Sequence, residues 1–269
     1  MAAKIAFVVL MIAATTLPAQ NPTIDRLPTI VRGALDPRTP KDGRQLLDRM
    51  RSAYLGKWFE TVTFTQQTIQ TRNGVTDTTT WYEALKTPDR LRIDFGDPKN
   101  GNGVLYTADS LYVVRGGQVT RTVPSGNPFL PFVIGVYAQP LDTTLRQISS
   151  YKFNLTKLYS TTWEGRPVHV AGTQSPSDTT SPQFWIDQER LVVVRMLVAL
   201  NPNAPTDVAD IRLDDYRPVA GGWLAVRVAI MHGGQVIQKE DYSDWRGNVD
   251  LPDDFFVAQK WGAVPHWHR

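Results

Sequence analysis

The residues of this chain that could do acid–base or metal chemistry are its four histidines. His169 alternates with valines in a strand-like stretch, and His232 adjoins a Gly-Gly turn, so neither is predicted to act as a base. His266 and His268 could bind a metal through two imidazoles, but no third ligand stands at a fixed spacing. Chain ends also tend to fray. The histidines therefore predict neither a catalytic nor a metal site.

Neighbouring carboxylates are the second candidates for chemistry. They occur at Asp214-Asp215, Glu240-Asp241 and Asp253-Asp254. Adjacent side chains point in different directions, whereas acid–base catalysis needs carboxylates that converge across a cleft. These pairs are therefore interpreted as solvated surface. The chain also has no G-x-S-x-G, phosphate-loop or H-E-x-x-H motif. The sequence predicts a protein that is not an enzyme and has no cofactor; a secreted hydrolase is the least supported alternative.

The first nineteen residues have the layout of a cleavable signal peptide. Lys4 is followed by an apolar run from Ile5 to Ala14, and Leu17-Pro18-Ala19 offers a cleavage site. A retained short membrane anchor is the alternative. The chain has no cysteine, which excludes disulfides, a thiol nucleophile and a lipidated cysteine after the leader. We expect a soluble periplasmic protein.

Charge and composition narrow the function further. The formal net charge of +3 becomes +2 when Lys4 leaves, because no other charged residue precedes Asp25. No basic cluster interleaved with aromatic residues is present, so nucleic acid is not an expected partner. With 42% hydrophobic and 20% charged residues, the chain is typical of a globular protein.

The domain organisation is simple. Residues 20–39, rich in proline, are predicted to be a flexible lead-in, and 40–269 a single domain. A helix is expected where apolar residues follow a helical period, with Asp42 or Thr39 as its cap and Gly56 at its end. Its apolar stripe consists of Leu46, Leu47, Met50, Ala53 and Tyr54.

The rest of the chain is dominated by short strands joined by tight turns. Asn73-Gly74, Ala108-Asp109-Ser110 and Gly116-Gly117 indicate hairpins. One interruption combines the apolar stretch Phe129–Tyr137 with a helix that begins near Asp142. The fold class is therefore mainly β (α+β), with ten or eleven antiparallel strands that curl around an interior. That interior is either a filled core or a cavity large enough for acyl chains.

Taken in chain order, several segments resemble motifs of the LolA/LolB/LppX-like superfamily of outer-membrane lipoprotein-sorting proteins. They are Phe64–Gln67, Trp81–Ile93, Ala108–Val114, Asn127–Leu130, Phe184–Asp187 and Leu251–Phe256. The resemblance implies an incomplete, strongly curled antiparallel β-barrel with an N-terminal helix and a helical lid insertion. It also implies a hydrophobic cavity for acyl chains. Thr87 stands where the carrier has a basic residue that holds the lid, so Arg90 or Arg92 would have to make that contact.

The resemblance implies a periplasmic carrier or chaperone for the acyl chains of lipoproteins or lipids. Its partners would be an inner-membrane donor and an outer-membrane acceptor, and the carrier itself would be a monomer. An envelope-stress sensor that binds a partner protein with the same fold is the alternative. The candidate lining and lid residues are Phe64, Trp81, Leu91, Leu105, Phe129, Phe132 and Trp185.

Overall fold

The computed structural model describes residues 39–268, except for residues 73, 125 and 202–203. The predicted signal peptide, residues 1–19, and all but the last residue of the predicted lead-in lie outside the described residues. In the described part of the chain, no helix is long and apolar enough to cross a membrane.

One antiparallel sheet of thirteen strands dominates the described residues. Its strands are β1 (Thr61–Arg72), β2 (Val75–Lys86), β3 (Arg90–Phe95), β4 (Gly103–Tyr106), β5 (Leu111–Arg115), β6 (Gln118–Val123), β7 (Leu158–Trp163), β8 (Arg166–Ala171), β9 (Gln183–Asp187), β10 (Val193–Asn201), β11 (Ala204–Val219), β12 (Gly222–His232) and β13 (Gln235–Gly247).

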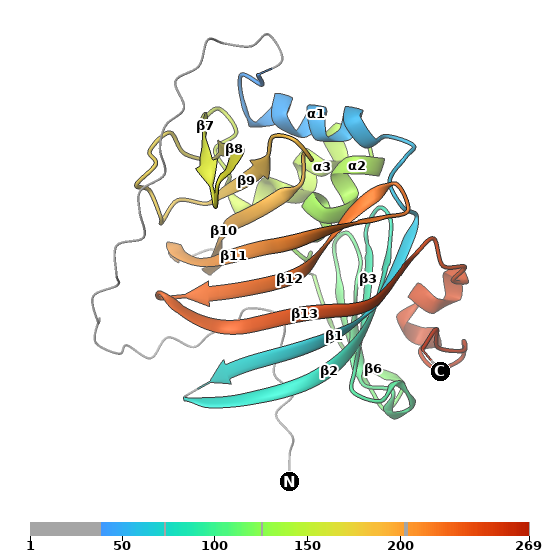
Figure 1. Cartoon of the computed structure of the whole chain (residues 1–269). Helices are drawn as coiled ribbons and strands as arrows, with labels where there is room; N and C mark the ends of the chain where they lie inside the picture. The colour runs from blue at the N-terminus through green and yellow to red at the C-terminus, as the bar shows by residue number, and fades with distance from the viewer. Residues whose placement is uncertain (1–38, 73, 125, 202–203, 269) are drawn as a thin grey trace.

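The strand order explains how one sheet is assembled from a series of hairpins. It runs β6-β5-β4-β3-β2-β1-β13-β12-β11-β10-β9-β8-β7, so only the β1–β13 contact joins strands distant in sequence. The sheet is strongly curved, and β3 and β6 cross the direction of β10 to β13 (Figure 1). It is an open sheet with β6 and β7 at its edges, which makes ten or eleven an underestimate of the strand number.

The three α-helices of the described residues gather at one end of the curved sheet (Figure 1). Helix α1 (Gly43–Tyr54) begins as expected, with the Asp42 side chain accepting from Gln45 N at 2.8 Å. Its stripe buries Leu46, Leu47 and Met50 completely. Gly56 follows with φ of +72°, a conformation that glycine adopts without strain. Helix α3 (Leu141–Ile148) occupies the stretch where the second helix was predicted.

The apolar stretch before α3 forms two short helical pieces. A π-helical turn, η2 (Pro131–Gly135), leads directly into α2 (Val136–Ala138). Local hydrogen bonds hold its start, where Asn127 Oδ1 accepts from Phe129 N at 2.8 Å. We call residues 127–138 the covering segment.

The two faces of the sheet have separate cores because side chains alternate along each strand. The concave face carries the main cluster, together with α1 and the covering segment. The convex face carries two smaller clusters: one around Leu105, Phe255 and Trp261, and one around Trp185 and Val194.

The C-terminal residues pack against this convex face, and their predicted fraying is wrong. Trp261 is 6% exposed, and His266 Nε2 lies 3.2 Å from Asp94 Oδ2. The short helices η4 (Asp253–Phe256) and η5 (Ala258–Lys260) place these aromatic side chains.

Candidate ligand cavity

An apolar cavity of about 90 Å³ lies on the concave face, between the sheet and the covering segment. Strand β2 contributes Trp81, Glu83 and Leu85, which alternate along the strand and so share one face. Nearly half of the remaining lining residues are aromatic. They are Trp58, Phe59, Phe64, Phe129, Phe132, Tyr137, Tyr216, Trp223 and Tyr242.

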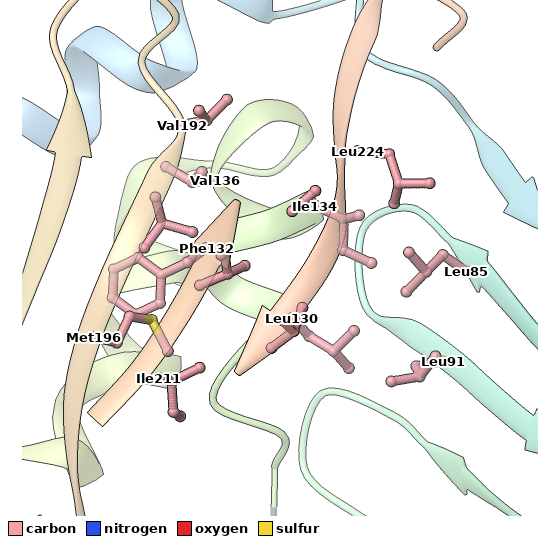
Figure 2. Packing of buried hydrophobic residues seen from close by; sticks show 14 of the residues in the cluster. Leu85, Leu91, Leu130, Phe132, Ile134, Val136, Val192, Met196, Ile211 and Leu224 are labelled. Carbon is pink, nitrogen blue, oxygen red and sulfur yellow. The ribbon is translucent and has the colours of Figure 1, made fainter. Parts of the chain in front are cut away.

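The covering segment fills the hollow of the sheet with aliphatic and aromatic side chains. Figure 2 shows Leu130, Phe132 and Ile134 between two arms of the sheet. Leu85 and Leu91 lie on one side, and Met196 and Ile211 on the other (Figure 2). Phe132 and Ile134 are fully buried there. The interior is therefore largely filled, and the cavity is what this packing leaves open.

Hydrogen bonds link both flanks of the covering segment to other parts of the fold. Just before the segment, Gly126 O accepts from Tyr151 Oη at 3.4 Å. Tyr137 Oη donates to Leu191 O at 2.9 Å, and Arg51 Nε donates to Gln139 O, just beyond the segment, at 2.8 Å. For residues 127–134, the described hydrogen bonds stay within the segment, such as Phe132 N to Phe129 O at 2.9 Å. The first half therefore contacts the sheet through apolar side chains.

Stacked aromatic rings hold the second half. Trp58 and Tyr137 stack with their centroids 3.7 Å apart, and Tyr54 meets both rings edge-on. Trp58, Phe59 and Tyr137 also line a second hollow of about 740 Å³ at the rim of the sheet, beside Lys86 and Asp250. These three rings form the wall between the inner cavity and the outer hollow.

Two carboxylic acids interrupt the apolar wall. Glu83 on β2 is 5% exposed and Glu240 on β13 is 9% exposed. Burial, together with the charge of Glu240, raises the pKa of Glu83 well above its ordinary range. Burial also raises the pKa of Glu240, although hydrogen bonds from Tyr242 and Gln238 act in the opposite direction.

These two acids differ in their partners. Tyr242 Oη donates to Glu240 Oε2 at 2.6 Å, and Gln238 Nε2 donates to Glu240 Oε1. The side chain of Glu83 makes no hydrogen bond or ion pair within the described residues. Glu240 is thus held as an acceptor by neighbouring donors, whereas Glu83 borders the cavity without a partner. The interpretation of Glu240 as solvated surface is wrong, because β13 turns its side chain to the concave face.

Five of the seven predicted lining residues border the cavity. They are Phe64, Trp81, Leu91, Phe129 and Phe132. Whether they bind a ligand stays a prediction.

Leu105 and Trp185 lie on the opposite face, so their assignment to the cavity is corrected. Leu105 sits between Val104 and Tyr106, which face the concave side, and Trp185 sits between Phe184 and Ile186, which do the same. Residues that face each other in an antiparallel pair share a face. Leu111 pairs with Tyr106, so an inward Leu111 already implied an outward Leu105.

The two arginines proposed for the lid contact are engaged elsewhere. Arg92 is buried on the convex face, where it forms a bidentate pair with Asp94 at 2.8 and 3.0 Å. Its guanidinium lies between the rings of Phe255 and Trp261, 4.0 and 3.8 Å from their centroids. Arg90 lies 3.5 Å from Asp89. The structure therefore contradicts a lid contact by Arg92 and provides none for Arg90 within the described residues.

The histidines have local partners. Burial lowers the pKa of His169 to about 4, and its Nδ1 lies 3.0 Å from Ser160 Oγ. No carboxylate hydrogen bonds to this imidazole in the described part of the chain, so the pair lacks the third member of a catalytic triad. His232 lies 2.6 Å from Asp207. The described residues contain no cluster of three metal-ligating side chains.

Glu83 and Tyr137 are the main site residues that sequence reasoning missed. Glu83 stands between Trp81 and Leu85 in strict alternation, which is the available sequence signal for a carboxyl facing the interior. Tyr137 ends the apolar stretch before Pro140, and only the tertiary fold places its ring on Trp58.

Comparison with known proteins yields relatives by structure alone. No family model matches the sequence, and no curated protein matches it. A DUF1329 family protein from Desulfovibrio piger is similar in structure, with a TM-score of 0.55 at 14% identity over 81% of this chain and 97% of that one. This likeness shows a shared fold.

Two other solved structures are similar to this chain with lower TM-scores. One is a LolA superfamily protein from Nitrosomonas europaea, with a TM-score of 0.48 at 13% identity, covering 80% of this chain and 97% of that one. The other is a putative outer membrane lipoprotein-sorting protein domain from Vibrio parahaemolyticus. Its TM-score is 0.48 at 14% identity, covering 78% of this chain and 94% of that one.

Proposed function

We propose that this protein is a periplasmic carrier or chaperone that shelters the acyl chains of lipoproteins or lipids on the concave face of its sheet. The observation that carries the proposal is an aromatic-lined cavity beneath a covering segment whose residues 127–134 contact the sheet through apolar side chains and make no described hydrogen bond to it. Moving hydrocarbon from water into such a site contributes about 0.8 kcal/mol per methylene.

The size of the cavity determines how binding must occur. Small-molecule sites usually measure about 300–1,000 Å³, whereas this cavity has a volume of about 90 Å³. An acyl chain therefore needs the covering segment to move outward, with the ligand replacing Leu130, Phe132 and their neighbours against the sheet. Exchange of one apolar surface for another leaves no buried backbone group without a partner.

The outer hollow offers a route for the chain. Trp58, Phe59 and Tyr137 separate it from the inner cavity. Rotation of the Trp58 and Tyr137 rings would join the two spaces. Lys86 and Asp250 at the rim of the hollow would remain beside the polar part of the cargo. A donor in the inner membrane and an acceptor in the outer membrane would load and unload the carrier, which would act as a monomer.

The direct test is purification of the full chain after export, followed by mass spectrometry of extracted lipids and of the intact protein. Co-purified acylated species, and uptake of a fluorescent acyl probe after delipidation, are expected. Absence of both would contradict the proposal. An envelope-stress sensor would instead capture a specific membrane regulator, and its loss would leave lipoprotein sorting intact.

Movement of the covering segment can be tested by thiol labelling. Because the sequence contains no cysteine, an introduced cysteine is the single thiol that can be labelled. Val133→Cys places a thiol in the first half of the segment, and Val119→Cys places one on β6 against the convex cluster. Addition of an acyl probe should change the labelling rate at position 133 at least threefold and leave position 119 unchanged. Equal rates with and without the probe at position 133 would contradict displacement of the segment.

A further inference from the structure

Glu83 is a buried carboxyl with nothing in the described residues to neutralise it or to donate to it. It is 5% exposed and borders the cavity. Its strand partner Phe64 stacks on Tyr242, with ring centroids 4.4 Å apart, so two aromatic rings lie beside the carboxyl. An unpartnered carboxyl in an apolar site is costly, and one role for it is to receive a ligand.

The charge balance of the cavity points to the sign of that ligand. Its lining contains Glu83 and Glu240 and, among the described residues, no lysine, arginine or histidine. The other titratable groups in the lining are Tyr137, Tyr216 and Tyr242, and burial raises the pKa of each. These tyrosines are neutral at pH 7, so the site holds acids and no base.

The tyrosine hydroxyls of the lining already donate to other groups. The hydroxyls of Tyr137, Tyr216 and Tyr242 donate to Leu191 O, Val193 O and Glu240, respectively. On the same face of the sheet, Gln66 Oε1 is buried and accepts no hydrogen bond. Trp58 Nε1, beneath the stacked ring of Tyr137, is buried and donates to no group in the described residues. Among the described residues, the lining therefore offers Glu83 no cationic donor.

We propose that the cavity selects an amphiphile whose polar end is a primary ammonium group, with Glu83 as its carboxylate partner and Glu240 as the second negative group. This assignment rests on the proposed function and names the chemistry of its cargo. Three N–H donors would satisfy the free acceptors, and the rings of Phe64 and Tyr242 favour a neighbouring cation. A charge-assisted hydrogen bond is about twice as strong as a neutral one.

Competing head groups fit less well. A carboxylate or phosphate would meet two acids and no base. A hydroxyl would bring a single donor and no charge. A quaternary ammonium would bring charge without any N–H donor. The preference order predicted for a common chain is therefore amine, quaternary ammonium, alcohol and carboxylate.

The test measures binding of four dodecyl compounds to the delipidated full-length protein by calorimetry at pH 7: dodecylamine, dodecyltrimethylammonium, dodecanol and dodecanoic acid, all below their aggregation limits. Dodecylamine should bind at least tenfold more tightly than dodecanol. In Glu83→Gln this ratio should fall to about one, while the affinity for dodecanol stays within twofold. The matched control is Glu164→Gln, an exposed acid in the β7–β8 turn, which should keep the tenfold preference.

The wild-type protein supplies a second readout that does not depend on a variant folding. Burial raises the pKa of Glu83 in the free protein, and pairing with an ammonium group would lower it. Calorimetry in two buffers of different ionisation enthalpy should therefore show proton release with dodecylamine and none with dodecanol.

The outcomes separate this inference from the proposed function. If dodecanol and dodecanoic acid bind but dodecylamine shows no preference, or if Glu83→Gln keeps the preference, the ammonium site is wrong and the carrier stands. If no dodecyl compound binds, both are wrong. An S-acylated peptide with a free α-amine, compared with its N-acetylated form and with a free amino lipid, distinguishes acylated protein from lipid as the source of the amine.

Discussion

The two faces of the sheet differ in whether a buried ionisable side chain has a partner. On the convex face, Arg92 is neutralised by Asp94 and lies between two aromatic rings. On the concave face, Glu83 has an aromatic wall but no partner among the residues that the structure describes. The two residues stand one strand apart, since Glu83 pairs with Ile93, the residue after Arg92. The comparison indicates that the paired charges on the convex face stabilise the fold, whereas the unpartnered carboxyl on the concave face lowers the stability of the fold.

The largest effect should come from breaking the convex pair. Arg92→Ala leaves Asp94 buried with only His266 beside it, and loss of one partner of a buried ion pair costs about 3–5 kcal/mol. Urea unfolding followed by circular dichroism measures this change. The control is Arg90→Ala on the same strand, whose side chain is 40% exposed and which should cost under about 1 kcal/mol. Equal costs for both variants would contradict the structural role given to the convex pair.

Removing the carboxyl of Glu83 on the concave face should change the stability in the opposite direction. Glu83→Gln should stabilise the protein by about 1–3 kcal/mol at pH 8, since an unpartnered buried acid no longer has to ionise or hold a proton. Folding raises the pKa of Glu83, so the wild-type protein loses stability as pH rises from the unfolded pKa through the folded one. The gain from Glu83→Gln should therefore shrink toward pH 4.

Unfolding curves of both proteins between pH 4 and 8 test that dependence. A destabilised Glu83→Gln at pH 8 would show that the carboxyl contributes to the fold, which would place it in the same class as Arg92.

A matched pair of alanines separates packing from binding. Ala225 borders the cavity, and Ala84 is buried in the convex cluster. Ala225→Leu should fill the cavity and weaken binding of a fluorescent acyl probe about tenfold, which is about 1.4 kcal/mol. Ala84→Leu should overpack the convex cluster, cost about 1–3 kcal/mol of stability and leave probe affinity unchanged. A loss of affinity in Ala84→Leu alone would reverse the assignment of the two faces.

Local patterns made much of the fold predictable. The stripe from Leu46 to Tyr54 and the Asp42 cap predicted α1, and the glycine turns predicted the hairpins, because those features are decided by neighbouring residues. The strand number was harder. Strands β7 to β13 lie beyond the helical interruption, and their place in the same sheet depends on the pairing of β13 with the distant strand β1.

Side chains were assigned to the wrong face of the sheet where the alternation along a strand and its pairing with the next strand were not considered. Phe184 and Ile186 face the main cluster, which forces Trp185 outward, and the same logic applies to Leu105 between Val104 and Tyr106. Arg92 was assigned to a lid contact because the resemblance to the carrier implied a basic residue near this turn, where Thr87 stands instead. Its partners Asp94, Phe255 and Trp261 meet only when the C-terminal residues pack on the convex face.

The most direct measurement of the carrier account is photo-crosslinking with a diazirine-bearing acyl probe, followed by peptide mapping. Crosslinks should fall on the cavity wall: β2 from Trp81 to Leu85, the covering segment, and β12 from Leu224 to Val228. Crosslinks centred on the convex residues Leu105, Trp185 and Trp261, or none above background, would contradict binding of acyl chains on the concave face.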